Sequence, residues 1–321
     1  MSRTTQVSTR LIIRRVLTGV AMLVTVSVLV FVATQALPGD IARTILGQNA
    51  TAEQLTQLRG ELGLDLPVWQ QYLHWATGLL TGDLGTSLAS GSPVAELLRV
   101  RVLNSLTVVL IALVITLPLG LLLGLAAARR GPADVGISAA VQTILSLPEF
   151  VVGIVLVVLF GGGLFRWLPP TSPLDPRQLA WNQPRLLILP IATMVLIALP
   201  HLVEATKTLL REELASDYVR WARLSGLGDV RLLTGYALPN VLGPISQVAG
   251  VTVNYLLGGV VAVETVFAFP GIGSELVAAV AARDIVVVQV IAIGIAAVLL
   301  VTFLIADLIG LLTNPRLRRS R

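Results

Sequence analysis

The stretch DYVRWARLSGLGDVRLLTGYALPN, residues 217–240, lies between two long apolar runs and holds three arginines and two aspartates. A single charge near the centre of a bilayer costs roughly 2.5–3.5 kcal/mol, so a segment with this charge density does not cross a membrane. Glycine interrupts the stretch at 226, 228 and 235, and glycine at such positions marks turns. The stretch therefore predicts a short helix and a turn at a membrane surface, between two spanning helices.

The rest of the chain is strongly apolar. Of its 321 residues 55% are hydrophobic and only 13% are charged, and its mean hydropathy is +0.85, a balance that a soluble domain does not show. A helix needs about 20 apolar residues to cross a bilayer. Six runs reach this length: 16–36, 102–127, 135–160, 186–204, 241–263 and 287–312. We therefore expect an all-α integral membrane protein with six transmembrane helices.

Lysine and arginine are distributed unevenly between the segments that join these runs. The two terminal segments together with 128–134 and 205–240 hold 15 Lys and Arg in 67 residues, whereas 37–102, 161–185 and 264–286 hold 8 in 114. Basic residues accumulate on the cytoplasmic side of membrane proteins. Both termini and the segment 205–240 are therefore predicted to be cytoplasmic.

The large extracytoplasmic segment, 37–101, contains signals for helices. Thr51 and Gln54 have the spacing of a capping box at a helix start. An amphipathic stretch rich in aromatic residues follows Pro67, which suits a helix lying at the outer membrane interface. An ordinary packed loop without a binding role is an equal alternative. We treat 1–321 as a single membrane domain that carries this segment and the extracytoplasmic loop 264–286.

The sequence excludes several kinds of chemistry. It has no cysteine, so disulfides, thiolate metal sites and cysteine nucleophiles are absent. Its sole lysine, Lys207, follows Thr206, so the chain has no Gly-Lys-Ser/Thr phosphate loop for ATP. The two histidines, His74 and His201, are too far apart in sequence to indicate a metal site. The dispersed basic residues lack an aromatic platform for nucleic acid, and we find no constellation of catalytic residues.

Polar side chains follow one face of three expected spans. On the third span they recur at i, i+4, i+8 and i+11, and on the fifth at i and i+7, while His201 and Glu204 lie on the fourth. These path candidates are Ser138, Gln142, Ser146, Glu149, Gln247 and Asn254. One interpretation is a water-accessible path for a polar solute, with a kink at Pro148 beside Glu149. The alternative is hydrogen bonding between helices, which averages about 0.6 kcal/mol per pair.

The short helix predicted within 217–240 has a recognisable face. Ser216 or Asp217 is a suitable N-cap, and Val219, Ala222 and Gly226 then share a face of small side chains. Such a helix, presented to the cytoplasm between two rigid spans, suits docking into a cleft of another protein. A membrane-surface loop without a partner is the alternative that the residues alone leave open.

The same stretch resembles the cytoplasmic loop of permeases in binding-protein-dependent ABC importers. That loop reads E-A-A-x3-G-x9-I-x-L-P, and four residues stand at its second alanine, glycine, leucine and proline: Ala222, Gly226, Leu238 and Pro239. Three residues replace its glutamate, first alanine and isoleucine: Arg220, Trp221 and Tyr236. The wording DYVR-x-AR-x-x-G is similar to the form used by the dipeptide/oligopeptide/nickel branch.

Five further motifs resemble that family's marks, and they stand in that family's order. They are LPGD at 37–40, GDLGTSL at 82–88, ETVFAFPGIG at 264–273, ARDIVVVQ at 282–289 and NPRLR at 314–318. The chain is thus identified as a member of the family, similar to its B-type peptide permease subunit. This resemblance implies the fold of a type I ABC importer permease in the bacterial cytoplasmic membrane.

The resemblance also implies a function. The chain would be a transport subunit, not an enzyme, and would form half of the translocation path for di- and oligopeptides. Nickel or another small polar solute is the alternative cargo. The implied partners are a second homologous permease, two cytoplasmic P-loop ATPases that use ATP and Mg, an extracytoplasmic substrate-binding (lipo)protein and membrane lipid. This chain itself would bind no cofactor. A secondary transporter with Glu149, His201 or Glu204 as proton relay is a remote alternative, since it gives the cytoplasmic loop no role.

Finally, the resemblance assigns roles to two segments. The loop 205–240 would carry the coupling helix that docks on an ATPase, with Trp221 as an anchor. Its residues would be Asp217, Tyr218, Arg220, Trp221, Ala222, Arg223, Gly226 and Leu227. The segment 264–273 would close an outer gate or contact the binding protein through Glu264, Phe267, Phe269 and Pro270. A purely packing role for that segment is an open alternative.

Overall fold

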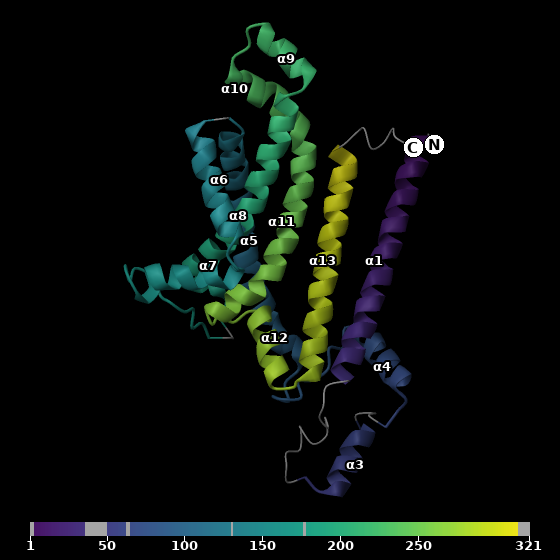
Figure 1. Cartoon of the computed structure of the whole chain (residues 1–321). Coiled ribbons are helices and arrows are strands. Elements are labelled where there is room, and N and C mark those ends of the chain that lie inside the picture. The colour runs from purple at the N-terminus through teal and green to yellow at the C-terminus, as the bar shows by residue number, and fades with distance from the viewer. Residues whose placement is uncertain (1–2, 36–49, 62–64, 130, 176–177, 314–321) are drawn as a thin grey trace.

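The computed structural model describes residues 3–35, 50–61, 65–129, 131–175 and 178–313. The motifs LPGD at 37–40 and NPRLR at 314–318 lie outside these residues. In the described part the regular structure is helical, and an isolated bridge between Thr86 and Pro93 is the one β-type pairing. Figure 1 shows the long helices side by side, with the start of α1 and the end of α13 at the same end of the molecule.

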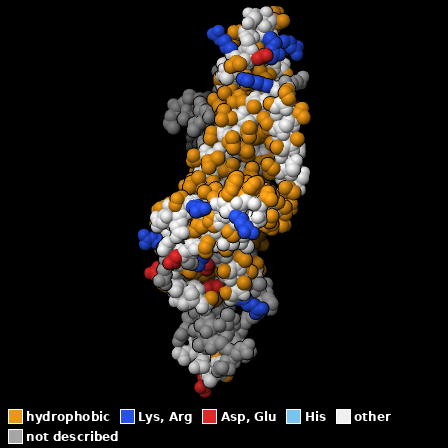
Figure 2. Space-filling model, turned by 90° about the vertical axis from the view of Figure 1, so that its left-hand side faces the viewer, with side chains coloured by type: hydrophobic (Ala, Val, Ile, Leu, Met, Phe, Trp, Pro, Cys, Tyr) orange, Lys and Arg blue, Asp and Glu red, His pale blue; other side chains and the backbone are white. Residues whose placement is uncertain are grey.

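Five helices in the described residues are long and apolar enough to cross a membrane. They are α1 (Arg3–Gln35), α5 (Val94–Ala128), α8 (Pro184–Leu214), α11 (Leu238–Val266) and α13 (Ile285–Thr313). They correspond to the first, second, fourth, fifth and sixth expected spans. Figure 2 shows an apolar surface along one face of the molecule, with charged side chains above and below it.

The third expected span is broken into two helices. It consists of α6 (Pro132–Leu145) and α7 (Glu149–Leu156), with a π-helical turn at Val157–Gly162, and the two halves meet at 107°. Pro148 precedes α7 and has no N–H to continue a helix, so the kink expected there is confirmed. Figure 1 shows α7 lying across the long helices, whereas α6 runs along them.

Two glycines one turn apart bring α5 and α8 into close contact. A Cβ on Gly120 would lie 2.6 Å from Cδ2 of Leu202, and a Cβ on Gly124 would lie 2.5 Å from Cβ of Thr206. Small residues at i and i+4 let membrane helices approach closely. The van der Waals contacts formed in this way hold the helices together in lipid, where the hydrophobic effect does not drive their association. This pair therefore positions α8, the most buried of the long helices.

The two largest core clusters lie along α8. Nearer the extracytoplasmic end, Met194 packs with Leu256 and Phe267, together with side chains from α5 and α7. Nearer the cytoplasmic end, Leu202 and Leu210 pack with further residues from α5 and α11. Both clusters place α8 at the centre of the helices that surround it.

The extracytoplasmic segment is helical in its described parts. The capping box of Thr51 and Gln54 is confirmed, with N···O distances of 3.0 and 3.3 Å, and α3 (Ala52–Glu61) follows it. The second expected helix, α4 (Val68–Thr81), is confirmed and packs on α1 through the rings of Phe31, Tyr72 and Trp75. At this end lie also α12 (Ile272–Ala281) and the start of α13, opposite to α9 (Asp217–Leu224) and α10 (Asp229–Leu232).

The glycine contact between α5 and α8 can be tested by adding one methyl group. Gly124→Ala would force Thr206 and the Val203 carbonyl away, and overpacking of this kind costs typically 1–3 kcal/mol. We expect a lower apparent unfolding temperature for the purified protein. Gly136→Ala on α6 is the control, because no atom lies within 4 Å of its added Cβ. Equal unfolding temperatures for the two variants would contradict this account of the packing.

Candidate functional site

The cytoplasmic stretch forms α9, and Gly226 ends this helix. Gly226 has a φ of +86°, in the left-handed region that favours glycine. The N–H of Gly226 donates to the Arg223 carbonyl at 3.0 Å, and the N–H of Leu227 donates to the Ala222 carbonyl at 3.3 Å. This is the Schellman arrangement that satisfies the last carbonyls of a helix. The expectation that Gly226 lies on a face of the helix is therefore wrong, because Gly226 is the residue that terminates it.

The orientation of α9 also differs from the expectation. The small-residue face turns toward the protein: Val219 is fully buried and Ala222 is half-buried. The opposite face carries Trp221, 70% exposed, and Leu224, 76% exposed, which are three residues apart and therefore neighbours on the helix. The surface that α9 offers to another protein is thus an apolar one formed by Trp221 and Leu224, and not the small-residue face.

Tyr218 fixes α9 to the two long helices beside it. Its hydroxyl donates to the carboxylate of Glu213 in the last turn of α8, and it accepts a hydrogen bond of 2.7 Å from the Asn240 amide near the start of α11. Burial, with the neighbouring Glu213 carboxylate, raises the pKa of the Tyr218 hydroxyl above its usual value, so the hydroxyl stays a proton donor at neutral pH. Glu213 and Asn240 could not be recognised as partners of Tyr218 from the sequence, since polar residues are expected anywhere in a cytoplasmic loop.

The arginines of the stretch border a cavity. Arg223 pairs with Asp229 at 3.4 Å, and Arg220 lies 3.9 Å from Asp217. Together with Arg129 and Arg211 they line a cavity of about 640 Å³ between α9 and the cytoplasmic ends of α5 and α8. The carboxylates offset part of this positive charge, and the guanidinium groups keep this end of the molecule in water.

A clamp of charged groups holds the cytoplasmic ends of α5, α6 and α8 together. Asp134, in the first turn of α6, pairs with Arg211 at 2.5 Å and with Lys207 at 3.3 Å, and Arg211 also donates to the Ala127 carbonyl at 2.9 Å. The Lys207 ammonium donates to Ser138 at 2.7 Å. The path candidate Ser138 therefore belongs to this clamp.

At the break in the third span, Glu149 meets residues of α8 and α11. Glu149 is the first residue of α7, and a Cβ on Gly259 of α11 would lie 3.2 Å from its Oε2. Tyr255 lies one turn before Gly259 on the same face of α11, close enough to Glu149 for the two side chains to interact electrostatically. The ring of His201 on α8 lies 4.4 Å from that of Tyr255, centroid to centroid. Sequence analysis singled out Glu149 and His201, whereas it missed Tyr255, a tyrosine in an apolar run with no neighbouring motif.

The other path candidates do not gather around Glu149. Gln142 and Ser146 are exposed on α6, which turns away from α7 by 107°, and Gln247 is exposed on α11. Asn254 is 9% exposed, and neither polar atom of its amide has a partner in the described part of the chain. The six path candidates therefore do not line one common surface. Ser138 lies in the cytoplasmic clamp, Glu149 lies at the break in the third span, and the other four lie elsewhere.

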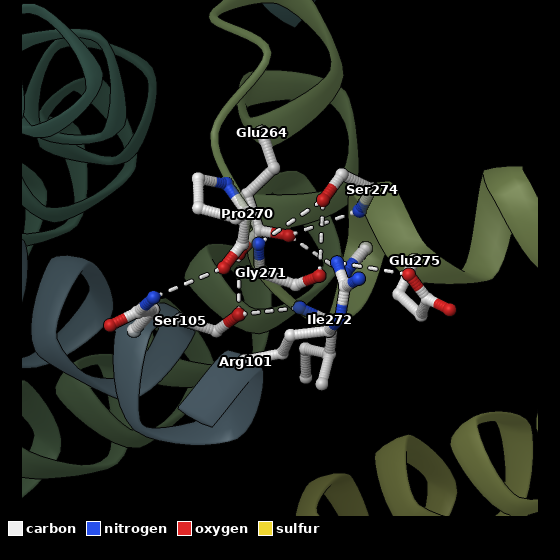
Figure 3. A network of polar contacts seen from close by, with 10 residues as sticks. Arg101, Ser105, Glu264, Pro270, Gly271, Ile272, Ser274 and Glu275 are labelled. Carbon is white, nitrogen blue, oxygen red and sulfur yellow. Dashed lines mark hydrogen bonds and ion pairs between the residues drawn. The ribbon is translucent and has the colours of Figure 1, made fainter. Parts of the chain in front are cut away.

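At the outer end of α11, the carboxylate of Glu264 organises a tight corner with α12 and α5. Glu264 is 1% exposed and accepts hydrogen bonds from the N–H groups of Gly273 at 2.7 Å and Ser274 at 3.2 Å, and from the Ser105 hydroxyl. Figure 3 shows these groups converging on one carboxylate. A Cβ on Gly271 would collide with this carboxylate, which is why the motif requires glycine there.

The corner is also joined to α5 at three residues. The Ser105 hydroxyl accepts from the Ile272 N–H at 2.9 Å, and the Asn104 amide donates to the Pro270 carbonyl at 3.2 Å. Arg101 pairs with Glu275 of α12 at 2.9 Å. Because α5, α11 and α12 share these bonds, the outer corner is one connected unit.

The side chains proposed for an outer gate or a binding-protein contact are all buried. Phe267 and Phe269 are 0% exposed and pack in the core, and Pro270 is buried as well. With Glu264 also buried, none of the four offers a surface to another protein in this structure. Their assignment to an outer gate or a binding-protein contact stays a prediction.

Two further motifs meet at the same end of the molecule. Asp284 of ARDIVVVQ accepts from the Ser87 hydroxyl of GDLGTSL and from the Ala89 N–H at 3.2 Å. The Gln289 amide donates to the Thr34 hydroxyl on α1 at 2.6 Å. In the described residues these motifs therefore join segments far apart in the sequence.

Removing the Ser105 hydroxyl tests the corner. Ser105→Ala leaves the Glu264 carboxylate short of a donor and the Ile272 N–H without its acceptor, and a buried unsatisfied group costs about 1–3 kcal/mol. We expect a lower apparent unfolding temperature than for Thr107→Ala, whose hydroxyl bonds only to a carbonyl of its own helix. A smaller effect for Ser105→Ala than for the control would contradict the role of Ser105.

Comparison with known families and proteins assigns the chain to a protein family. The family model described as the binding-protein-dependent transport system inner membrane component matches residues 116–319, and the model for the N-terminal part of such membrane components matches 8–123. Together the two matches cover most of the chain, including α9, the break in the third span and the outer corner.

Individual relatives match along almost their entire length. A putative peptide transport system permease protein of Brucella abortus (strain 2308) is 33% identical over 314 residues, 97% of this chain and 99% of the relative. A probable D,D-dipeptide transport system permease protein of Escherichia coli (strain K12) is 34% identical over 317 residues, 92% and 93% of the two chains. A glutathione transport system permease protein of Salmonella choleraesuis (strain SC-B67) is 34% identical over 310 residues, 96% and 98%. The chain therefore belongs to the inner membrane components of binding-protein-dependent transport systems, as a multi-pass permease subunit.

Proposed function

We propose that this permease, as a single domain over 1–321, forms half of the path by which an ATP-driven importer takes up di- and oligopeptides. A second homologous permease forms the other half. Two cytoplasmic P-loop ATPases supply the energy with ATP and Mg, and an extracytoplasmic substrate-binding lipoprotein delivers the peptide. The family supports a binding-protein partner, while the number and kind of the remaining subunits are part of the proposal.

The observation that carries this proposal is the outward apolar face of α9. Trp221 and Leu224 are 70% and 76% exposed on α9, which lies past the cytoplasmic ends of the long helices. Tyr218 holds the same helix to Glu213 of α8 and to Asn240 of α11. A force applied to Trp221 therefore reaches two spanning helices directly, as a coupling helix requires.

The names of the relatives support a peptide as the cargo. They specify peptides, D,D-dipeptides and glutathione, which share a short chain with an amide bond and charged ends. We expect ATP-dependent uptake of di- or tripeptides by proteoliposomes that contain the full assembly and receive the loaded binding protein. Uptake by this chain without any ATPase would overturn the proposal in favour of a secondary transporter.

Trp221→Ala tests the docking face. Tryptophan anchors at interfaces typically contribute at least about 2 kcal/mol, so we expect an ATPase affinity at least about thirty-fold lower and a matching loss of import. The side chain is largely exposed, so the unfolding temperature of the permease should not change. Val230→Ala is the control, because Val230 is 60% exposed on neighbouring α10. Equal ATPase binding by wild type and Trp221→Ala would remove α9 from the docking surface.

Gly226 provides a second test, of the shape of the coupling segment. A β-branched residue in the left-handed region costs roughly 1–3 kcal/mol, whereas asparagine tolerates that region better. No atom lies within 4 Å of an added Cβ, so the backbone conformation is the variable that changes. We expect Gly226→Val to lower import strongly and Gly226→Asn to retain most of it. Similar import rates for both variants would show that the end of α9 is not critical.

A further inference from the structure

The carboxylate of Glu149 lacks a lysine or arginine partner in the described residues, where no ion pair joins it to either kind of side chain. By contrast, Asp134 at the cytoplasmic end pairs with Lys207 and Arg211, and Glu275 at the outer end pairs with Arg101. Its neighbours are the Tyr255 side chain, His201 beyond it and the Gly259 backbone. A carboxylate among membrane helices is costly, so its retention calls for a cationic partner or for water.

The surroundings of Glu149 leave room for a ligand. Gly258, next to Gly259 on α11, is exposed, and no atom lies within 4 Å of where its Cβ would be. Glu149 and Tyr255 are half-buried, and His201 is exposed. A main chain can therefore approach α11 at Gly258 without meeting a side chain, while Glu149 and Tyr255 offer oxygen acceptors beside it.

We propose that Glu149, with Tyr255, binds the protonated amino terminus of the transported peptide. This inference rests on the proposed function. An amino terminus has a pKa of about 7.7–8.0, so it is largely an ammonium group at neutral pH. The carboxylate accepts from that ammonium group, and the Tyr255 oxygen accepts a second of its protons through a free lone pair. This contact does not depend on peptide side chains, so one site serves peptides of different sequence.

In this site His201 positions the side chain of Tyr255. Its ring contacts the ring of Tyr255 at 4.4 Å and leaves the tyrosine fewer orientations. No group of three or more potential metal ligands occurs in the described residues, so we assign the site an organic cation.

Import of matched peptides by the full assembly tests the proposal. One peptide has a free amino terminus, and the other is the same peptide with a hydrogen in place of that amino group. The same saturating binding protein delivers both, so its own preference cancels when variants are compared with wild type. We expect Glu149→Gln to lower import of the free peptide about ten- to hundred-fold more than import of the des-amino peptide, as for loss of a charge-assisted hydrogen bond. Glu149→Asp should restore part of the preference.

Glu204→Gln is the charge-matched control. Glu204 lies on α8 beside Lys207, at 3.8 Å, and its loss should affect both peptides equally. Equal losses of both peptides in Glu149→Gln would overturn the inference, and would point instead to a cation of a partner subunit or to proton transfer. Import of neither peptide by the wild type would overturn the proposed function as well, so the two failures are distinguishable.

A labelling experiment gives an independent measurement. The chain has no cysteine, so Gly258→Cys creates a unique thiol one residue before Gly259, whose Cβ position lies 3.2 Å from Oε2 of Glu149. Peptides carry a thiol-reactive group on the side chain of either the first or the last residue, and both ends keep their charges. During turnover we expect labelling mainly from the first residue, and less of it when Glu149→Gln is added. Preferential labelling from the last residue would overturn the proposal.

Discussion

The hydrogen bonds to the Glu264 carboxylate hold together the outer end of the permease. They join the end of α11 to the first turn of α12 and to α5, and the Asn104 and Arg101 bonds reinforce the same unit. At its other end α11 is tied to α9 through Asn240 and Tyr218. A helix of 29 residues rises about 1.5 Å per residue, so α11 spans roughly 40 Å between α9 and the outer corner. A displacement of α9 is therefore expected to reach the outer corner.

The break in the third span brings the start of α7 into contact with α11. Because α6 ends at Leu145 and Pro148 cannot continue its hydrogen bonds, α7 crosses the other helices and brings Glu149 against Gly259 and Tyr255. That contact lies on the same helix that carries Asn240 and Glu264. A rotation or tilt of α11 thus changes the surroundings of the Glu149 carboxylate, and would connect the proposed coupling segment with the proposed solute site.

Sequence patterns predicted the elements better than their mutual arrangement. Apolar length predicted every span, and the spacing of Thr51 and Gln54 predicted the start of α3, because these depend on residues close in the sequence. The face of α9 was predicted wrongly: Val219 with Ala222 and Trp221 with Leu224 are both plausible contact faces, and only the position of α8 and α11 decides between them. The partners of Glu264 and Tyr218 were likewise inaccessible, since they lie on other helices. The resemblance to a family identified the motif residues without giving their contacts.

The positions of the ion pairs indicate which part of the molecule can change its conformation. At the cytoplasmic end, Asp134 is held by Lys207 and Arg211, and at the outer end Glu275 is held by Arg101. Separating such pairs leaves a charge without its partner, so each clamp resists motion within itself. Glu149 lies between these clamps, near Tyr255 and His201, and no lysine or arginine of the described chain forms an ion pair with it. A permease that must bind and release a charged solute needs such a group in this region, because a permanent internal ion pair would compete with the solute for it.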